Sequence, residues 1–340
     1  MASITIFSSI ASIAQSLDPN LPLQVLQDPA LSGFGGTVHF DPSALKKVTV
    51  DALKNAEILI SEPAVIAQLL EYDANALTSL RWCQSTYAGV DPIFKASLSF
   101  PLPWKLTRFA GCFGPPIAEW CLARIIAHER CFAASANDQC AKSWAGSKCI
   151  LEYRYLSSLT LTVLGCGDIG RCIAKAAGAF GMKTVGYGKT NRTANNVEGV
   201  DEYTTNITDA LQAADYIVSV LPSTPETRNL LNRSALECAS KSNGGKCPVF
   251  LNVGRGDVIS EADLLHALDE KWESAAILDV FEVEPIPAES RLWDRSDVVV
   301  SPHVSGLTQA SDVPKVFLEN YQRYIQGSEL KYVVDWMKGY

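Results

Sequence analysis

The chain has 340 residues, a formal net charge of -8 and a pI near 5.1. This length exceeds what one hydrophobic core usually supports, so we expect two domains. The acidic balance, without a Lys/Arg cluster, argues against a nucleic-acid surface. No apolar run reaches the roughly 18 residues that span a bilayer. We therefore expect a small-molecule partner, no nucleic acid and no membrane.

The cysteines and histidines point away from disulfides and metals. The ten cysteines include no Cys-x-x-Cys pair, and several fall in runs typical of helix or strand. We interpret them as reduced and buried, which predicts a cytoplasmic location. The four histidines, at positions 39, 128, 266 and 303, lack metal-ligand spacing, so no metal site is expected.

Apolar runs alternate with helical stretches along most of the chain, which is typical of parallel sheets with crossover helices. The N-terminal run lacks a basic segment, so we interpret it as a first strand rather than a signal peptide. Strands of a first sheet are expected at Ile4–Phe7, Glu57–Ile60 and Leu80–Cys83.

A long amphipathic helix is expected after Gly114-Pro-Pro116, and we place the crossing between domains there. Six strands, the count of a dinucleotide-binding sheet, are expected beyond it. They are Leu159–Leu164, Lys183–Tyr187, Tyr216–Leu221, Val249–Val253, Ala276–Leu278 and Val298–Val300. After Gly306 a further helix is expected from Asp312 to Gln326.

A Gly-x-Gly-x-x-Gly loop lies between the strand ending at Leu164 and a helical run. In this setting Gly165 makes the tight turn, Gly167 admits a pyrophosphate and Gly170 lets helix and strand pack closely. The loop therefore predicts a dinucleotide site. Arg171 either reaches a phosphate from the first helical turn or is a solvated surface residue, and both readings stay open.

The next strand indicates which dinucleotide is bound. An NAD site normally shows an acidic residue here for the ribose hydroxyls, but Val185–Arg192 contains no Asp or Glu. Lys189, Thr190 and Arg192 are donors suited to a 2'-phosphate. NADP(H) is therefore favoured over NAD(H), which stays the alternative, and these three residues can also be read as an ordinary polar loop.

Three residues follow successive apolar runs in the second half of the chain. Arg255 offers a planar fork of donors suited to a carboxylate. His303 can act as a general acid toward a carbonyl oxygen, and Glu284 can orient its ring. Glu282 is a rival to Glu284, because alternation puts both on one side of an extended segment. Taken singly, each of these residues also fits a structural role.

Six motifs taken in order resemble the D-isomer-specific 2-hydroxyacid dehydrogenases. They are the glycine loop, Leu221–Thr227, Asn252–Gly256, Asp279–Pro285, Ser301–His303 and Ser85–Asp91. Within the family, the chain is most similar to the NADPH-preferring glyoxylate/hydroxypyruvate reductase branch. The resemblance covers the chain from about residue 55 to the end.

The resemblance implies an α/β fold of two Rossmann-like domains. A dinucleotide-binding domain, residues 114–306, is inserted into a flavodoxin-like substrate domain formed by residues 1–113 and 307–340. The helix after Pro116 resembles the family's dimerisation helix, which implies a homodimer through the nucleotide domain.

The family also implies the roles of particular residues. Arg255 matches the arginine that binds the substrate, Glu284 the acid paired with the histidine, and His303 the proton donor. The backbone N–H groups of Tyr87, Ala88 and Gly89 match a loop that helps hold the substrate carboxylate. The expected cofactor-binding residues are Gly165, Gly167, Asp168, Ile169, Gly170, Arg171, Lys189, Thr190, Arg192, Leu221, Pro222, Thr227, Val253, Gly254, Asp279 and His303, with Asp279 near the nicotinamide carboxamide.

The sequence therefore predicts an enzyme that reduces a small 2-oxo acid to the D-2-hydroxy acid with NADPH. Glyoxylate, hydroxypyruvate and bulkier 2-oxo acids stay open as substrates. The alternative is a dinucleotide-sensing scaffold similar to the C-terminal binding protein corepressors. It is disfavoured because the chain has no extended disordered tail and no peptide-docking signature.

Overall fold

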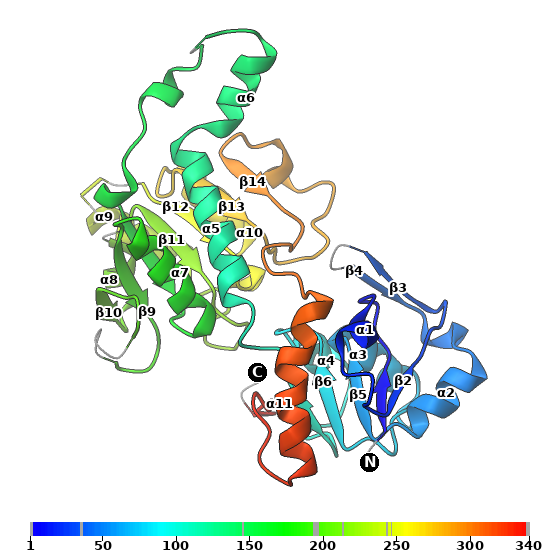
Figure 1. Cartoon of the computed structure of the whole chain (residues 1–340). Coiled ribbons are helices and arrows are strands. Elements are labelled where there is room, and N and C mark those ends of the chain that lie inside the picture. The colour runs from blue at the N-terminus through cyan, green and yellow to red at the C-terminus, as the bar shows by residue number, and fades with distance from the viewer. Residues whose placement is uncertain are drawn as a thin grey trace. The chain divides into compact units, whose positions relative to one another are not determined.

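The computed structural model describes residues 3–34, 37–144, 146–192, 197–212, 214–242, 244–245 and 247–337. The chain divides into two compact units (Figure 1). The first unit is Met1–Cys112 with Leu307–Tyr340, and the second is Phe113–Gly306. The first boundary lies one residue ahead of the expected position, and each unit has its own parallel sheet.

The first unit contains a five-stranded sheet in the order β2-β1-β5-β6-β7. All neighbouring strands are parallel, and numbered within this sheet the order is 2-1-3-4-5, that of flavodoxin-like folds. The strands are β1 (Ile4–Ile6), β2 (Leu23–Val25), β5 (Ile58–Ser61), β6 (Trp82–Ser85) and β7 (Lys105–Thr107). A separate antiparallel pair consists of β3 (Leu31–Phe34) and β4 (Thr37–Phe40).

Strand β6 begins two residues later than expected and ends on polar residues. Gln84 and Ser85 are fully buried there. The Gln84 side-chain amide donates to the carbonyl oxygens of Ser85 and Thr107, at 2.9 and 3.4 Å. These bonds satisfy a polar side chain in the core, so an apolar run alone does not mark this strand.

The C-terminal helix completes the core of the first unit. Helix α11 (Val313–Ile325) begins one residue after the predicted start and ends one residue before the predicted end. The Phe317 ring stacks on the Trp82 ring with centroids 5.2 Å apart, and the Trp82 indole N–H donates to Thr107 Oγ1 at 2.8 Å. The other helices of this unit are α1 (Ile13–Ser16), α2 (Lys47–Lys54), α3 (Pro63–Tyr72) and α4 (Asp91–Lys95), with 3-10 turns at Pro42–Ala44 and Ala310–Asp312.

The second unit contains a seven-stranded sheet in the order β10-β9-β8-β11-β12-β13-β14, with all neighbours parallel. Numbered within the sheet this is 3-2-1-4-5-6-7, the dinucleotide-binding order with one more strand. The strands are β8 (Thr160–Leu164), β9 (Lys183–Tyr187), β10 (Glu202–Thr204), β11 (Tyr216–Ser219), β12 (Val249–Asn252), β13 (Ala275–Leu278) and β14 (Val298–Val300). The expected count of six was wrong, because the three-residue edge strand β10 carries no apolar run.

Helices cover the sheet of the second unit. Helix α5 packs closely on α7, where a Cβ at Gly114 would collide with the Cys172 sulfur. Residues of α8, α9 and α10 share one core cluster with the strands. The helices are α5 (Gly114–Glu129), α6 (Phe132–Cys140), α7 (Asp168–Ala179), α8 (Ile207–Gln212), α9 (Arg233–Ser242) and α10 (Glu261–Asp269), with 3-10 turns at Lys148–Leu151, Leu156–Ser158, Gly256–Val258 and Arg291–Asp294. Within the ranges that the structure describes, no helix is long and apolar enough to cross a membrane.

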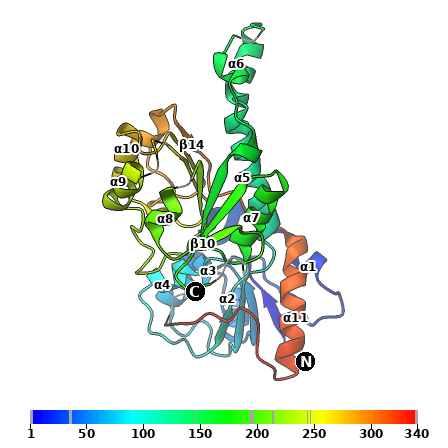
Figure 2. The ribbon, with the colours of Figure 1, turned by 90° about the vertical axis from the view of Figure 1, so that its left-hand side faces the viewer.

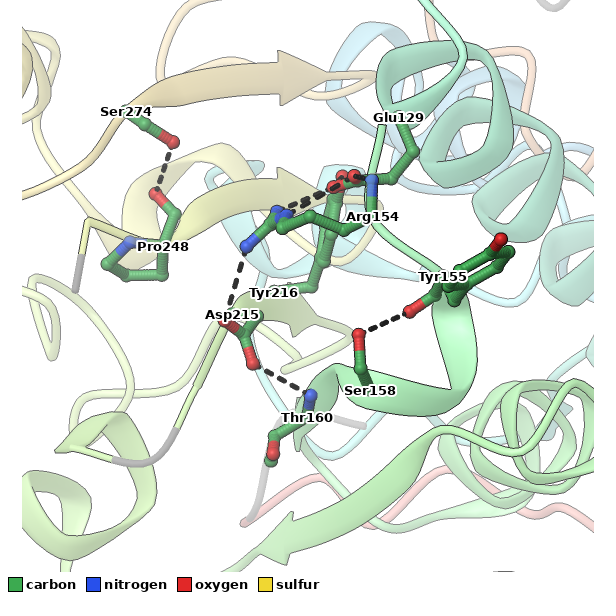
Figure 3. A network of polar contacts seen from close by, with 9 residues as sticks. All are labelled: Glu129, Arg154, Tyr155, Ser158, Thr160, Asp215, Tyr216, Pro248 and Ser274. Atoms are coloured by element: carbon green, nitrogen blue, oxygen red, sulfur yellow. Dashed lines mark hydrogen bonds and ion pairs between the residues drawn. The ribbon is translucent and has the colours of Figure 1, made fainter. Parts of the chain in front are cut away.

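Residues 131–158, which we call the arm, include α6 and extend away from the sheet of their own unit in both views (Figures 1 and 2). A polar network closes the base of the arm (Figure 3). Glu129 accepts hydrogen bonds from Tyr216 Oη, at 2.6 Å, and from Arg154. Arg154 Nη1 also pairs with Asp215 Oδ1 at 3.3 Å, and Asp215 Oδ2 accepts the Thr160 N–H at 2.9 Å. The arm is thereby joined to the beginnings of β8 and β11.

Candidate active site

The glycine loop connects β8 to α7 with a geometry suited to a phosphate. Gly165 has φ +104°, a region that favours glycine, and a Cβ at Gly170 would collide with the Gly165 carbonyl oxygen. A Cβ at Gly167 would meet no described atom within 4 Å, and no side chain caps α7 at this residue. The N–H groups of the first turn of α7 therefore fit a dinucleotide pyrophosphate.

Two further loops meet the glycine loop at the carboxyl edge of the sheet. A Cβ at Gly165 would lie 3.3 Å from Leu221 Cδ2, and one at Gly254 would lie 2.7 Å from the Leu221 backbone nitrogen. The turn after Leu221 is fixed by Thr227, whose hydroxyl donates to the Pro222 carbonyl. Open α/β sheets bind their ligands at this edge.

The remaining residues expected around the pyrophosphate lie at the same edge. Asp168 and Ile169 are in the first turn of α7, and Val253 follows β12. The Arg171 side chain is exposed, and its Nε donates to the Gly167 carbonyl at 3.3 Å.

The exit of β9 contains an ion pair that the sequence did not indicate. Lys189 Nζ lies 3.0 Å from Glu226 Oε2, and both side chains are more than half exposed. The Thr190 carbonyl accepts a bond from the Tyr203 hydroxyl at 2.9 Å, and Arg192 is exposed. Glu226 comes from the loop after β11, so only the fold brings it to Lys189.

The catalytic candidates all belong to the second unit, and two of them are in direct contact. His303 Nδ1 lies 2.8 Å from Glu284 Oε2. The other Glu284 oxygen accepts the Phe281 N–H at 2.9 Å. Because Nδ1 faces the carboxylate, Nε2 is the nitrogen that can serve a substrate. Arg255 follows β12, and its Nη1 donates to the Gly254 carbonyl at 2.7 Å.

The charge state of Glu284 suits its partner. Burial opposes ionisation of this carboxyl. The hydrogen bond and charge of His303, the Phe281 N–H and the charge of Arg255 outweigh burial, so the pKa of Glu284 is lowered. The rival acid, Glu282, instead accepts the Glu261 N–H at 3.3 Å.

Asp279 holds the loop that carries His303. Its Oδ1 accepts bonds from the Ser301 hydroxyl, at 2.6 Å, and the Val304 N–H, at 2.9 Å, while Oδ2 accepts the Ser305 N–H at 2.8 Å. Its backbone carbonyl accepts the His303 N–H at 2.9 Å, and His303 has a left-handed backbone with φ +53°. Asp279 was expected beside the carboxamide, and sequence reasoning missed this positioning role because no motif spacing encodes it.

The Tyr87 loop of the first unit differs from the expectation in one donor. The Tyr87 N–H donates to Ser85 Oγ at 3.0 Å, and the same hydroxyl donates to the Tyr87 carbonyl at 2.7 Å. The Tyr87 N–H is therefore already engaged within this turn. Ala88 and Gly89 are the other two residues predicted to donate from this loop.

The described ranges contain no group of three or more His, Cys, Asp or Glu side chains placed to hold a metal ion.

Comparison with known proteins identifies relatives over most of the chain. Residues 122–305 match the family described as D-isomer specific 2-hydroxyacid dehydrogenase, NAD binding domain. A solved D-isomer specific 2-hydroxyacid dehydrogenase family protein from Aeromonas salmonicida is 31% identical, with a TM-score of 0.80 over 98% of this chain and 99% of that chain.

Two reductases are also similar. The NADPH-dependent glyoxylate/hydroxypyruvate reductase of Sinorhizobium meliloti, solved with NADP and sulfate, is 25% identical, with a TM-score of 0.79 over 100% of both chains. Glyoxylate/hydroxypyruvate reductase A of Photorhabdus laumondii is 28% identical over 262 residues, 74% of this chain and 79% of the relative.

Proposed function

Because the chain belongs to the D-isomer-specific 2-hydroxyacid dehydrogenase family, whose members are oxidoreductases with a nicotinamide dinucleotide cofactor, we propose that it reduces a small 2-oxo acid with NADPH. The substrate is of the glyoxylate or hydroxypyruvate type, and the product is the D-2-hydroxy acid. The observation that carries the proposal is the 2.8 Å pair of His303 and Glu284, in the same unit as Arg255 and the glycine loop.

The proton transfer follows from this pair. When bound, the reduced nicotinamide supplies the hydride that the carbonyl carbon accepts. Protonated His303 gives its Nε2 proton to the carbonyl oxygen, and Glu284 orients the ring through Nδ1. Oxo acid, reduced cofactor and one proton thus give hydroxy acid and oxidised cofactor.

Substrate binding is assigned to two sets of donors. The Arg255 guanidinium forms a forked contact with the substrate carboxylate and polarises the adjacent carbonyl. In the first unit, the Ala88 and Gly89 N–H groups are assigned as further donors to a substrate carboxylate. On this proposal the first unit is the substrate domain and the second is the dinucleotide domain.

The cofactor preference is assigned to the exit of β9. The segment Val185–Arg192 has no acidic residue to repel a 2'-phosphate, and Lys189 and Arg192 are cations suited to bind it. NADP(H) is the proposed preferred cofactor, and NAD(H) the weaker one.

We also propose a homodimer through the second unit. Several large apolar side chains of the arm are exposed, and Trp144 is fully exposed. Clustered exposed apolar side chains mark interaction sites in soluble proteins. The other exposed large apolar side chains of the arm are Phe132, Leu151, Tyr153 and Tyr155.

The test is NADPH oxidation with glyoxylate, hydroxypyruvate, pyruvate and a branched 2-oxo acid. We expect the first two to have the highest kcat/KM, and the reverse reaction to accept only the D-hydroxy acid. Cofactor binding without turnover of any oxo acid would favour the scaffold alternative instead. Oxidation of the L-hydroxy acid would contradict the assigned stereochemistry.

A further inference from the structure

The second nucleotide strand lacks an acidic residue at its end, yet the fold places a carboxylate there. Lys189 lies two positions beyond the end of β9, and its ammonium is 3.0 Å from the Glu226 carboxylate. In dinucleotide-binding sheets this strand end faces the adenosine ribose, where a carboxylate favours the 2'-hydroxyl and a cation the 2'-phosphate. Glu226 and Lys189 thus present both kinds of group at one place.

The position of Glu226 is fixed by the turn that carries it. The Thr224 N–H donates to Thr227 Oγ1 at 2.8 Å, and the Thr227 hydroxyl donates to the Pro222 carbonyl. The Ser223 hydroxyl joins this turn to the Asp257 carboxylate. A turn held at both ends keeps Glu226 opposite Lys189.

We infer that Glu226 is a cofactor-specificity residue that narrows the preference for NADPH over NADH. It lies in the loop after β11 and takes the place of the acid that is missing at the end of β9. The inference rests on the proposed function for the position of the ribose.

Two physical effects give Glu226 this role. Lys189 shares its charge and its donors between Glu226 and a 2'-phosphate, so the existing ion pair competes with the phosphate. The phosphate also brings nearly two negative charges toward a carboxylate that stays ionised, because the Lys189 contact lowers the pKa of Glu226. NADH carries only a hydroxyl here, and this hydroxyl can donate a hydrogen bond to the carboxylate.

The test measures dissociation constants for NADPH and NADH by fluorescence titration, independently of turnover. We expect Glu226→Gln to tighten NADPH binding about three- to tenfold and to leave NADH binding equal or weaker, because exposed charge pairs have modest effects. Glu237→Gln is the matched control, since Glu237 forms a similar exposed pair with Lys241 at 2.6 Å on α9. The control should not change the ratio of the two constants.

A second variant separates the two effects. Lys189→Met should weaken NADPH binding, and adding Glu226→Gln to it should restore part of that affinity if the carboxylate repels the phosphate directly. If the second substitution restores no NADPH affinity, the whole effect of Glu226 on NADPH binding comes from its competition for Lys189. Raising the salt concentration should reduce every NADPH effect.

An unchanged NADPH-to-NADH ratio in Glu226→Gln, or weaker NADPH binding, would overturn the inference. This result differs from failure of the proposed function. An enzyme that reduces no 2-oxo acid contradicts the proposed reaction, and one that binds NADH more tightly than NADPH contradicts the proposed preference. In both cases the change in the NADPH-to-NADH ratio caused by Glu226→Gln still tests the role of Glu226.

Discussion

At the scale of single residues, His303 is held by two acids with different tasks. Glu284 contacts the imidazole ring, whereas the Asp279 carboxylate accepts the N–H groups of the two residues after His303, and the Asp279 carbonyl accepts the N–H of His303 itself. The left-handed backbone of His303 is costly for a residue with a side chain, and these bonds stabilise it. The ring and its backbone are therefore fixed independently.

The first prediction concerns the proton donor. His303→Gln should keep cofactor affinity but lower kcat/KM for the oxo acid about 10²- to 10⁴-fold, the usual contribution of positioned proton transfer. Glu284→Gln should give a smaller loss, because the histidine remains but loses the carboxylate that orients its ring. Steady-state kinetics with NADPH titrations checks both variants, and near-normal turnover in His303→Gln would remove this residue from the mechanism.

The second prediction concerns the carboxylate clamp. Arg255→Lys keeps the charge but loses the planar fork, so KM for the oxo acid should rise and kcat should fall together. The cofactor dissociation constant serves as the control and should stay the same. If both kinetic constants are unaltered, Arg255 is a loop residue only.

The third prediction uses a carboxyl group away from the catalytic residues. Glu273 precedes β13, is 1% exposed, and neither of its oxygens has a hydrogen-bond partner in the described ranges. Burial raises its pKa from 4.5 to about 8. The unfolded chain ionises this group near pH 4.5 and the folded chain only near pH 8, so the folded state loses stability as the pH rises between these values.

Glu273→Gln cannot ionise and should be the more stable protein at pH 7 by on the order of 3 kcal/mol, with the difference vanishing near pH 4. Denaturant unfolding at both pH values measures this difference. Glu270→Gln, at an exposed neighbouring position, should show no such dependence on pH. Equal stability of wild type and Glu273→Gln at pH 7 would show that Glu273 ionises freely.

At the scale of elements, the strands with a continuous apolar run could be predicted from the sequence, and those without one could not. The expected strands at Lys183–Tyr187 and Val298–Val300 coincide with β9 and β14, and the expected C-terminal helix coincides closely with α11. Strands β2, β7 and β10 have three residues each and include polar ones, so no apolar run marks them and their pairing partners define them.

The same distinction separates the residues of the candidate site. Arg255, Glu284 and His303 follow three adjacent parallel strands, so the order of the motifs already indicates that they share one edge. Glu226 and the bonds of Asp279 depend on how loops fold against one another. No local pattern in the sequence encodes such contacts.

The fourth prediction concerns the base of the arm. Burial opposes ionisation of Glu129, but the Arg154 and Tyr216 hydrogen bonds and the Arg154 charge lower its pKa. Arg154→Ala leaves this acid without its cation and should lower the free energy of unfolding by on the order of 1 to 3 kcal/mol. This value is below that of a fully buried pair, because the Arg154 side chain is about half exposed. Since the folded pKa is lowered, the stabilisation is present above about pH 4.5 and is lost as the pH falls through the folded value.

Thermal unfolding and limited proteolysis within residues 131–158 measure the effect of Arg154→Ala. Lys148→Ala is the matched control, because Lys148 forms an exposed pair with Glu152 in the same arm at 2.9 Å. Only Arg154→Ala should speed cleavage of the arm. Equal cleavage of the two variants would show that the network does not hold the arm.

At the scale of the whole molecule, the chain passes between its units twice, after Cys112 and after Gly306. The two passages meet at one place in the second unit. A Cβ at Gly306 would lie 2.8 Å from Ile117 Cγ1 and 3.4 Å from Phe113 Cδ1. Ends that lie together allow a domain to be inserted or excised without breaking its core.

The last prediction follows from this arrangement. Expressed alone, residues 113–306 should fold and bind NADPH with an affinity close to that of the whole chain. The fragment should also keep the oligomeric state of the whole chain if the arm forms the dimer contact. The fragment should reduce no oxo acid, because the Ala88 and Gly89 donors belong to the other unit. Circular dichroism, cofactor titration and sedimentation measure these properties. Reduction of oxo acids by the fragment would refute the role assigned to the first unit, and loss of cofactor binding in a folded fragment would refute the role assigned to the second.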